Sequence, residues 1–159
     1  MNHLQIPENL LPISVLPPAT DAAGRTGAWV SLKSATRAWV VAYIDQGNAA
    51  TIALSINQAS AIAGTGSKVI TNVVPIWANQ DGAASVFTRA TDAVNFTTSA
   101  AVKKKIVVFL IDPETLDVAG GFDCITLITG ASNAANLTSA LIWLETSYGQ
   151  ATPINALAD

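Results

Sequence analysis

Side chains that could do chemistry are few in this sequence and widely separated. The chain of 159 residues has a single histidine, His3, and a single cysteine, Cys124. His3 lies in an N-terminal segment that we expect to be extended, so a Ser-His-Asp or Cys-His triad has no anchored base. A metal site built from several histidines is impossible. The sequence therefore predicts a protein that is not an enzyme and that uses no cofactor.

One acidic group remains as a candidate for metal or hydrolytic chemistry. Asp112, Glu114, Asp117 and Asp123 are close in sequence and could ligate Ca²⁺ or supply the carboxylate pair of a glycosidase. Their spacing does not follow the calcium-loop pattern, and acidic turn residues beside strands are usually solvated. We therefore expect no metal ligand and no catalytic residue among them.

The four tryptophans, at positions 29, 39, 77 and 143, leave two interpretations open. Exposed indole rings could line a sugar-binding face, because they combine a large apolar surface with one polar atom. Three of the four lie inside apolar strands, however, and this position favours a role in the core. A carbohydrate-binding or host-attachment module is the alternative function that these residues suggest.

The charge balance excludes several kinds of partner. Charged residues make up 12% of the chain, the net charge is −3, and the pI is about 4.9. A nucleic-acid binder would need a basic surface, and the lone basic cluster, Lys103–Lys105, is expected to keep a strand edge soluble. The longest apolar runs are far shorter than the roughly 20 residues of a membrane helix. We expect neither nucleic acid nor membrane as a partner, and a weakly charged surface suits a protein covered by neighbours.

The elements that must position these residues are strands. Short apolar runs are separated by Gly, Pro, Asn and Asp, and residues 50–57 alternate between apolar and polar. Strands are expected at residues 29–32, 37–45, 50–57, 69–77, 85–89, 93–98, 105–111, 122–129 and 140–145. This spacing predicts an all-β fold, an antiparallel β-sandwich of jelly-roll type. The buried core should include Ile52, Leu54, Ile56, Val107, Phe109 and Cys124.

The two ends of the chain are predicted to be extended arms around one sandwich domain, residues 21–147. Prolines at positions 7, 12, 17 and 18 exclude a helix in residues 1–20, and Pro153 lies in residues 148–159. Both arms carry apolar side chains, and we expect at least one arm to contact a neighbouring subunit or another protein, by adding to a sheet edge or filling a groove. These interface residues are Leu10, Leu11, Ile13, Val15, Leu16, Ile154 and Leu157.

Five segments carry a resemblance to a known family. They are residues 26–33 (TGAWVSLK), 47–59 (GNAATIALSINQA), 63–68 (AGTGSK), 116–124 (LDVAGGFDC) and 153–159 (PINALAD). Together they span nearly the whole chain, in order, and the chain resembles a family of small virion structural proteins of tailed bacteriophages and prophages.

The resemblance implies a non-enzymatic protein that decorates or stabilises the phage head. Its partners would be the major capsid protein, which at least one arm would contact, or other virion proteins, and it would form a homo-oligomer, a dimer or a trimer. It would be assembled in the bacterial host cytoplasm and would reside on the capsid surface. A hydrolase is the least favoured alternative, because the sequence lacks the histidines that such a site usually needs.

Overall fold

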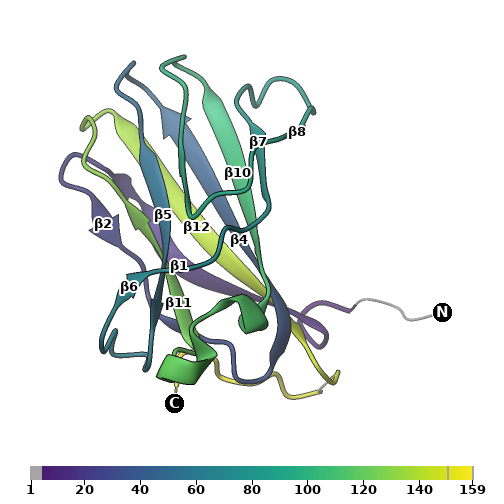
Figure 1. Cartoon of the computed structure of the whole chain (residues 1–159). Coiled ribbons are helices and arrows are strands. Elements are labelled where there is room, and N and C mark those ends of the chain that lie inside the picture. The colour runs from purple at the N-terminus through teal and green to yellow at the C-terminus, as the bar shows by residue number, and fades with distance from the viewer. Residues whose placement is uncertain (1–4, 150, 159) are drawn as a thin grey trace.

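The computed structural model describes residues 5–149 and 151–158, and the described chain is a sandwich of two antiparallel sheets (Figure 1). Sheet A has the order β1-β12-β4-β10-β7-β8, and sheet B has the order β2-β11-β5-β6, with β3 paired to β11 and β9 paired to β5. The strands are β1 (Leu10–Thr20), β2 (Arg25–Thr26), β3 (Val30–Ser31), β4 (Ala35–Gln46), β5 (Ala53–Ala59), β6 (Lys68–Val69), β7 (Ile76–Asn79), β8 (Thr88–Arg89), β9 (Asn95–Thr97), β10 (Lys104–Ile111), β11 (Cys124–Thr129) and β12 (Asn136–Thr146). Two single-turn 3₁₀ helices, η1 (Pro113–Thr115) and η2 (Val118–Gly120), join β10 to β11 near the C-terminus (Figure 1).

The strand order is that of a jelly roll, which confirms the predicted fold class. With the short strands β3, β6, β7 and β8 set aside, eight strands remain in chain order. The first, eighth, third and sixth of these are neighbours in sheet A, and the second, seventh, fourth and fifth are neighbours in sheet B. Two interleaved Greek keys produce this order. In the described part of the chain, no helix has the length and hydropathy needed to cross a membrane.

The core lies between the two sheets and contains all but one of the residues that the sequence predicted. Leu54 and Ile56 on sheet B, Ile52 just before β5, and Val107 and Phe109 on sheet A are all fully buried. Cys124 is also fully buried, as predicted, but it lies outside the apolar cluster between the sheets, and its Sγ donates to Asp123 Oδ1 at 3.2 Å. Alternation along each strand directs every second side chain inward, which is why a pattern of period two locates the core residues.

The N-terminal arm is where the predicted organisation is wrong. Residues 10–20 form β1, an edge strand paired antiparallel with β12 from Leu10 opposite Glu145 to Thr20 opposite Leu137. Prolines are tolerated on an edge strand, and register shifts between Ser14 and Ala19 accommodate Pro17 and Pro18. The sandwich therefore begins about ten residues earlier than predicted. The expected strand addition takes place within the chain itself.

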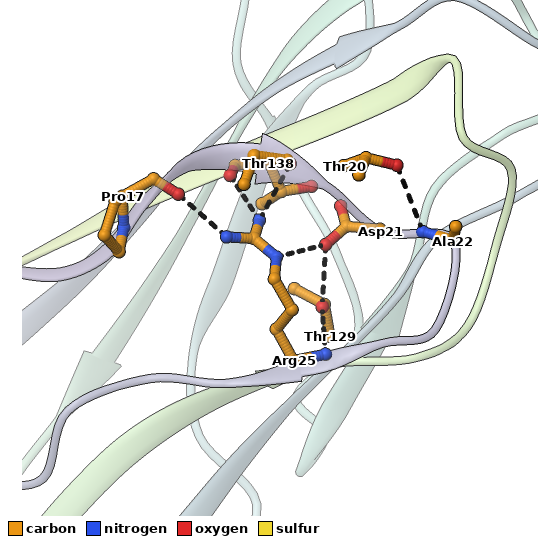
Figure 2. A network of polar contacts seen from close by, with 8 residues as sticks. Pro17, Thr20, Asp21, Ala22, Arg25, Thr129 and Thr138 are labelled. Carbon is orange, nitrogen blue, oxygen red and sulfur yellow. Dashed lines mark hydrogen bonds and ion pairs between the residues drawn. The ribbon is translucent and has the colours of Figure 1, made fainter.

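A polar cluster fastens β1 to the rest of the sandwich (Figure 2). The guanidinium of Arg25, on β2, donates to the carbonyl oxygens of Pro17 (2.8 Å), Ala19 (3.0 Å) and Thr138 (2.5 Å). It also donates through Nε to Oδ1 of the fully buried Asp21, at 3.1 Å. These hydrogen bonds connect β2 of sheet B to β1 and β12 at the edge of sheet A. Residues 17–19 are therefore not part of a detached arm.

The C-terminal segment also packs against its own chain where it is described. The backbone N–H of Ser31 donates to the carbonyl oxygen of Ala156 at 2.9 Å, and Ala156 is buried. Ile154 packs against the core, whereas Leu157 keeps 45% of its surface exposed. A contact between Leu157 and another subunit stays a prediction.

Two local expectations also differ from the structure. The strand expected at residues 69–77 is divided, because β6 belongs to sheet B and β7 to sheet A, and residues 70–75 cross between them. Lys103–Lys105 do not keep an edge soluble, because β10 is an interior strand between β4 and β7. Lys103 pairs with Asp81, Lys104 is exposed, and Lys105 is fully buried.

Candidate protein-contact face of sheet A

The acidic residues singled out from the sequence serve the turns around η1 and η2. Asp112 caps η1 by accepting from the backbone N–H of Glu114 at 3.0 Å. Asp117 accepts from Lys68 Nζ at 2.5 Å and from the backbone N–H of Gly120 at 3.0 Å. The hydrogen bond from Lys68 is the main cause of the lowered pKa of Asp117, and the bond from Gly120 adds to it.

These carboxylates are not gathered around one point. Asp123 lies 3.7 Å from Lys33 Nζ, so it is engaged by a different cation from Asp117. Within residues 5–149 and 151–158, no group of three His, Cys, Asp or Glu side chains could hold a metal ion. His3, the one histidine, lies outside the described residues.

The outward side of sheet A offers a different candidate site. Every second residue of its strands points away from sheet B, and we call these side chains the outer face. The outer face comprises Leu10, Pro12 and Ser14 of β1; Arg37, Trp39, Val41, Tyr43 and Asp45 of β4; Trp77 of β7; Lys104, Ile106, Val108 and Leu110 of β10; and Leu137, Ser139, Leu141, Trp143 and Glu145 of β12. Apolar side chains form its centre, and Tyr43, Leu137 and Leu141 are 42%, 42% and 38% exposed.

Register places these side chains in rows across the sheet. The middle row runs from Trp77 through Val108 and Val41 to Leu141, four apolar residues on four neighbouring strands. On one side of it, Leu110, Trp39, Trp143 and Pro12 form the next row; on the other side, that row is Ile106, Tyr43 and Ser139. Antiparallel sheets with one free side usually carry polar residues there. An outer face that is apolar over three rows indicates a surface that another molecule covers.

Trp39 and Trp143 form the centre of a shallow hollow on this face. They are cross-strand partners on β4 and β12, and each is partly buried. Together with Leu10, Val41, Val108, Arg37 and Glu145 they line a hollow of about 650 Å³. The expectation that three of the four tryptophans lie in the core is wrong, because Trp39, Trp77 and Trp143 are on the outer face and Trp29 is only partly buried.

Charged residues occupy the two ends of the outer face. Arg37 is the register partner of Glu145 at one end, and Asp45 is the partner of Lys104 at the other. Each end therefore carries one positive and one negative side chain. Beside the middle row, the guanidinium of Arg89 stacks 4.8 Å from the ring of Trp77. The outer face thus combines an apolar centre with a charge-balanced rim, the usual composition of a protein interface.

The residues that were predicted to form the interface do not form this site as a set. Ile13, Val15 and Leu16 are buried in the chain's own core, so the prediction that they face a partner is wrong. Leu11 packs against the core, and Leu10 alone among the predicted residues lines the hollow on the outer face.

Sequence reasoning missed the outer face because β4 and β10 are apolar on both sides. One signal was available, however. In residues 37–45 the core-facing positions are small or aliphatic, whereas the alternate positions hold Arg37, Trp39, Tyr43 and Asp45. A strand whose alternate positions begin and end with charges points that side toward solvent.

Comparisons of this chain with protein-family models, with curated proteins and with solved structures find no match.

Proposed function

We propose that this chain is a non-enzymatic structural protein of a tailed-bacteriophage virion, and that it decorates and stabilises the head. The observation that carries the proposal is the outer face, an apolar sheet surface with a charge-balanced rim. Such a surface is suited to permanent cover by protein. The resemblance of segments 26–33, 47–59 and 116–124 to small virion proteins supplies the viral context.

The strand order adds support by analogy of fold. Jelly rolls recur in viral capsid proteins and in lectins, so the fold agrees with the proposal without selecting it. A decoration protein acts through many identical copies on a repeating lattice. Weak single contacts then sum to strong attachment through multivalency, and a rigid sandwich suits that role. The proposed partner is the major capsid protein, and the proposed location is the outside of the capsid.

The test uses particles of the phage that encodes this chain. Purified protein is mixed with heads that lack it, and the pelleted fraction is measured by sedimentation. Saturable binding at a fixed ratio to the major capsid protein supports the proposal, and heads carrying the protein should resist heat or chelation longer than bare heads. Native particles that contain none of the protein, or a failure to sediment with heads, would contradict it.

A second candidate function is glycan binding, and the Trp39–Trp143 pair favours it. Two adjacent indole rings in an open hollow, with Arg37 and Glu145 beside them, could stack on a sugar and bond its hydroxyls. Titration with host-surface polysaccharide would show saturable binding that Trp143→Ala abolishes and that Trp29→Ala, at a partly buried position outside the outer face, leaves intact. Absence of saturable binding by the wild-type protein removes this candidate.

A further inference from the structure

The outward residues of β4 form a symmetric pattern of side-chain classes, except that the charges at its two ends have opposite signs. In order they are Arg37, Trp39, Val41, Tyr43 and Asp45: basic, aromatic, aliphatic, aromatic and acidic. Reversing the strand leaves the three apolar classes in place and exchanges the sign of the two charges. A strand with this pattern is complementary to an antiparallel copy of itself.

We propose that a second copy of this chain covers the outer face, with β4 of one copy lying antiparallel over β4 of the other. A two-fold axis in the plane between the sheets, perpendicular to β4 and passing beside Val41, relates the two copies. The proposal rests on the proposed function in one respect, that the outer face is a protein contact surface. The second copy occupies that surface, so the contact with the major capsid protein would lie elsewhere on the dimer.

The rows of the outer face match under this rotation. Arg37 of each copy lies over Asp45 of the other, and the row of Trp39 and Leu110 lies over the row of Tyr43 and Ile106. The middle row, with Val108, Val41 and Leu141, lies over itself, so the most apolar residues are covered at the centre. A two-fold interface requires this kind of self-complementary surface.

The β10 strand adds a second pair of opposite charges. Lys104 begins β10, and Asp112 follows its last residue with an extended backbone, which leaves both exposed and on the same side by alternation. The rotation that brings Arg37 to Asp45 also brings Lys104 toward Asp112 of the second copy. Four charge pairs would then border the interface, two of each kind.

A parallel arrangement of the copies fits the charges less well. An axis running along β4 brings Arg37 over Arg37 and Asp45 over Asp45, which is repulsive at both ends. An axis between β4 and β12 brings Arg37 over Glu145, yet it places Asp45 over Leu137 and leaves that carboxylate facing an apolar side chain. The antiparallel arrangement in turn places Glu145 over Leu137, but it gives an opposite charge to both Arg37 and Asp45 of β4 and to Lys104 of β10.

The outer face is large enough for such a contact. From Arg37 to Asp45 the rows span about 27 Å at roughly 3.4 Å per residue, and four strands span about 19 Å at roughly 4.8 Å per strand. The projected area is therefore about 500 Å², and the protruding side chains make the accessible area larger. Stable interfaces bury about 800 Å² on each partner, which is of the same order.

The test reverses charges one at a time and then mixes the variants. Arg37→Glu places two acidic groups together at each end of the dimer, and Asp45→Arg places two basic groups together. Each variant alone should raise the dimer dissociation constant at least about tenfold. An equimolar mixture should form a heterodimer, because Glu at position 37 of one chain then meets Arg at position 45 of the other. Analytical ultracentrifugation and native mass spectrometry measure the mass, which should be about twice 16.4 kDa.

Three controls make the result specific. Lys33→Glu lowers the net charge by the same amount as Arg37→Glu, at an exposed position outside the outer face. It should leave the dimer intact. Circular dichroism verifies that each variant is folded. The wild-type protein gives a measurement without any substitution: dilution through the dissociation range should shift the tryptophan emission to longer wavelength, as Trp39 and Trp143 become exposed to water.

Several results would overturn the proposal. A wild-type protein that stays monomeric at 100 µM or above would do so, and so would a dimer that neither charge reversal weakens. If dimer formation recovers in Arg37→Glu/Glu145→Arg but not in the mixture of Arg37→Glu with Asp45→Arg, the copies are related by the axis between β4 and β12 instead. Capsid binding is measured separately: a dimer that does not bind heads contradicts the proposed function alone, and a monomer that binds heads contradicts this inference alone.

Discussion

The ammonium group of Lys105 lies 2.8 Å from Oε1 of Gln46 inside the sandwich, and both side chains are buried. The same nitrogen donates to the carbonyl oxygen of Ser99 at 2.6 Å and to Ser99 Oγ at 3.1 Å. All three acceptors are neutral. Burial lowers the pKa of Lys105 below its ordinary value of 10.5, because the charged form is poorly solvated there.

Lys105 should make the protein more stable as the pH rises. Between its lowered folded pKa and 10.5, the unfolded chain binds more protons than the folded chain, so the free energy of unfolding increases with pH. In Lys105→Met this increase should disappear. Urea unfolding of both proteins between pH 7 and pH 10.5 measures it, and two curves that stay parallel would show that burial does not shift this group.

The same substitution should cost little stability at neutral pH. Gln46 Oε1 keeps the hydrogen bond from Thr98 Oγ1 at 3.0 Å, and the carbonyl of Ser99 keeps the one from Gln46 Nε2 at 3.0 Å. Ser99 Oγ loses the hydrogen bond from Lys105, but Ser99 is exposed, so water can replace that donor. An apolar side chain of similar length replaces a buried charge. We expect Lys105→Met to be neutral or stabilising by about 1–4 kcal/mol at pH 7. Marked destabilisation of Lys105→Met would mean that the ammonium group is needed to hold Gln46 and Ser99 in place.

Removing Arg25 should be strongly destabilising. Asp21 is fully buried, and its Oδ2 has no hydrogen-bond partner among the described residues, so Arg25 provides the compensating charge. Arg25→Met should cost about 3–5 kcal/mol by leaving that carboxylate alone in the interior. The double variant Asp21→Asn/Arg25→Met should recover part of the loss. Urea unfolding of the wild type, the two single variants and the double variant gives the coupling energy. Strictly additive losses would contradict the interaction between Arg25 and Asp21.

Phe109 should be among the most sensitive core positions. It is fully buried on β10 between the sheets, so Phe109→Ala should cost about 3–5 kcal/mol through lost burial and a new cavity. Phe87→Ala, at a side chain that is 47% exposed, is the matched control and should cost far less. Thermal unfolding compares them, and similar melting temperatures for both variants would be inconsistent with this packing.

Chelators should leave the folded protein unchanged. Asp112 and Asp117 are engaged by backbone N–H groups and, for Asp117, by Lys68, so their carboxylates have partners without an added cation. We expect the same melting temperature with and without EDTA, measured by circular dichroism after dialysis. A fall of many degrees that added Ca²⁺ reverses would point back to these turns as a metal site.

The two chain ends should differ in what their removal does. Deleting residues 1–16 removes Ile13, Val15 and Leu16 from the core, and the remaining chain should fail to fold stably. Deleting residues 151–159 removes the hydrogen bond from Ser31 to Ala156 and the packing of Ile154, for an expected cost of about 1–3 kcal/mol. Circular dichroism and urea unfolding distinguish them. A folded, stable protein without residues 1–16 would contradict the role of β1.

Local sequence was enough to predict the class of fold and much of the core. Alternation at Ile52, Leu54 and Ile56, together with regularly spaced turn residues, identified strands with one side buried, because these signals depend on near neighbours in the chain. The same signals could not identify the partner of β1, since its prolines argue locally for an arm while β12 lies more than a hundred residues away.

Tertiary structure alone decided which side of each central strand faces solvent. Both sides of β4 and β10 are apolar, so alternation has no contrast there, and pairing with β12 and β7 placed Trp39 and Val108 outside and Val40 and Phe109 inside. The burial of Lys105 likewise depends on Gln46, which is 59 residues away in the chain and lies beside it through the pairing of β4 with β10. The sequence by itself therefore determined a β-sandwich with a buried core. The outer face arises from strand pairing over long separations, and the charged ends of the outward positions in residues 37–45 were its one local signal.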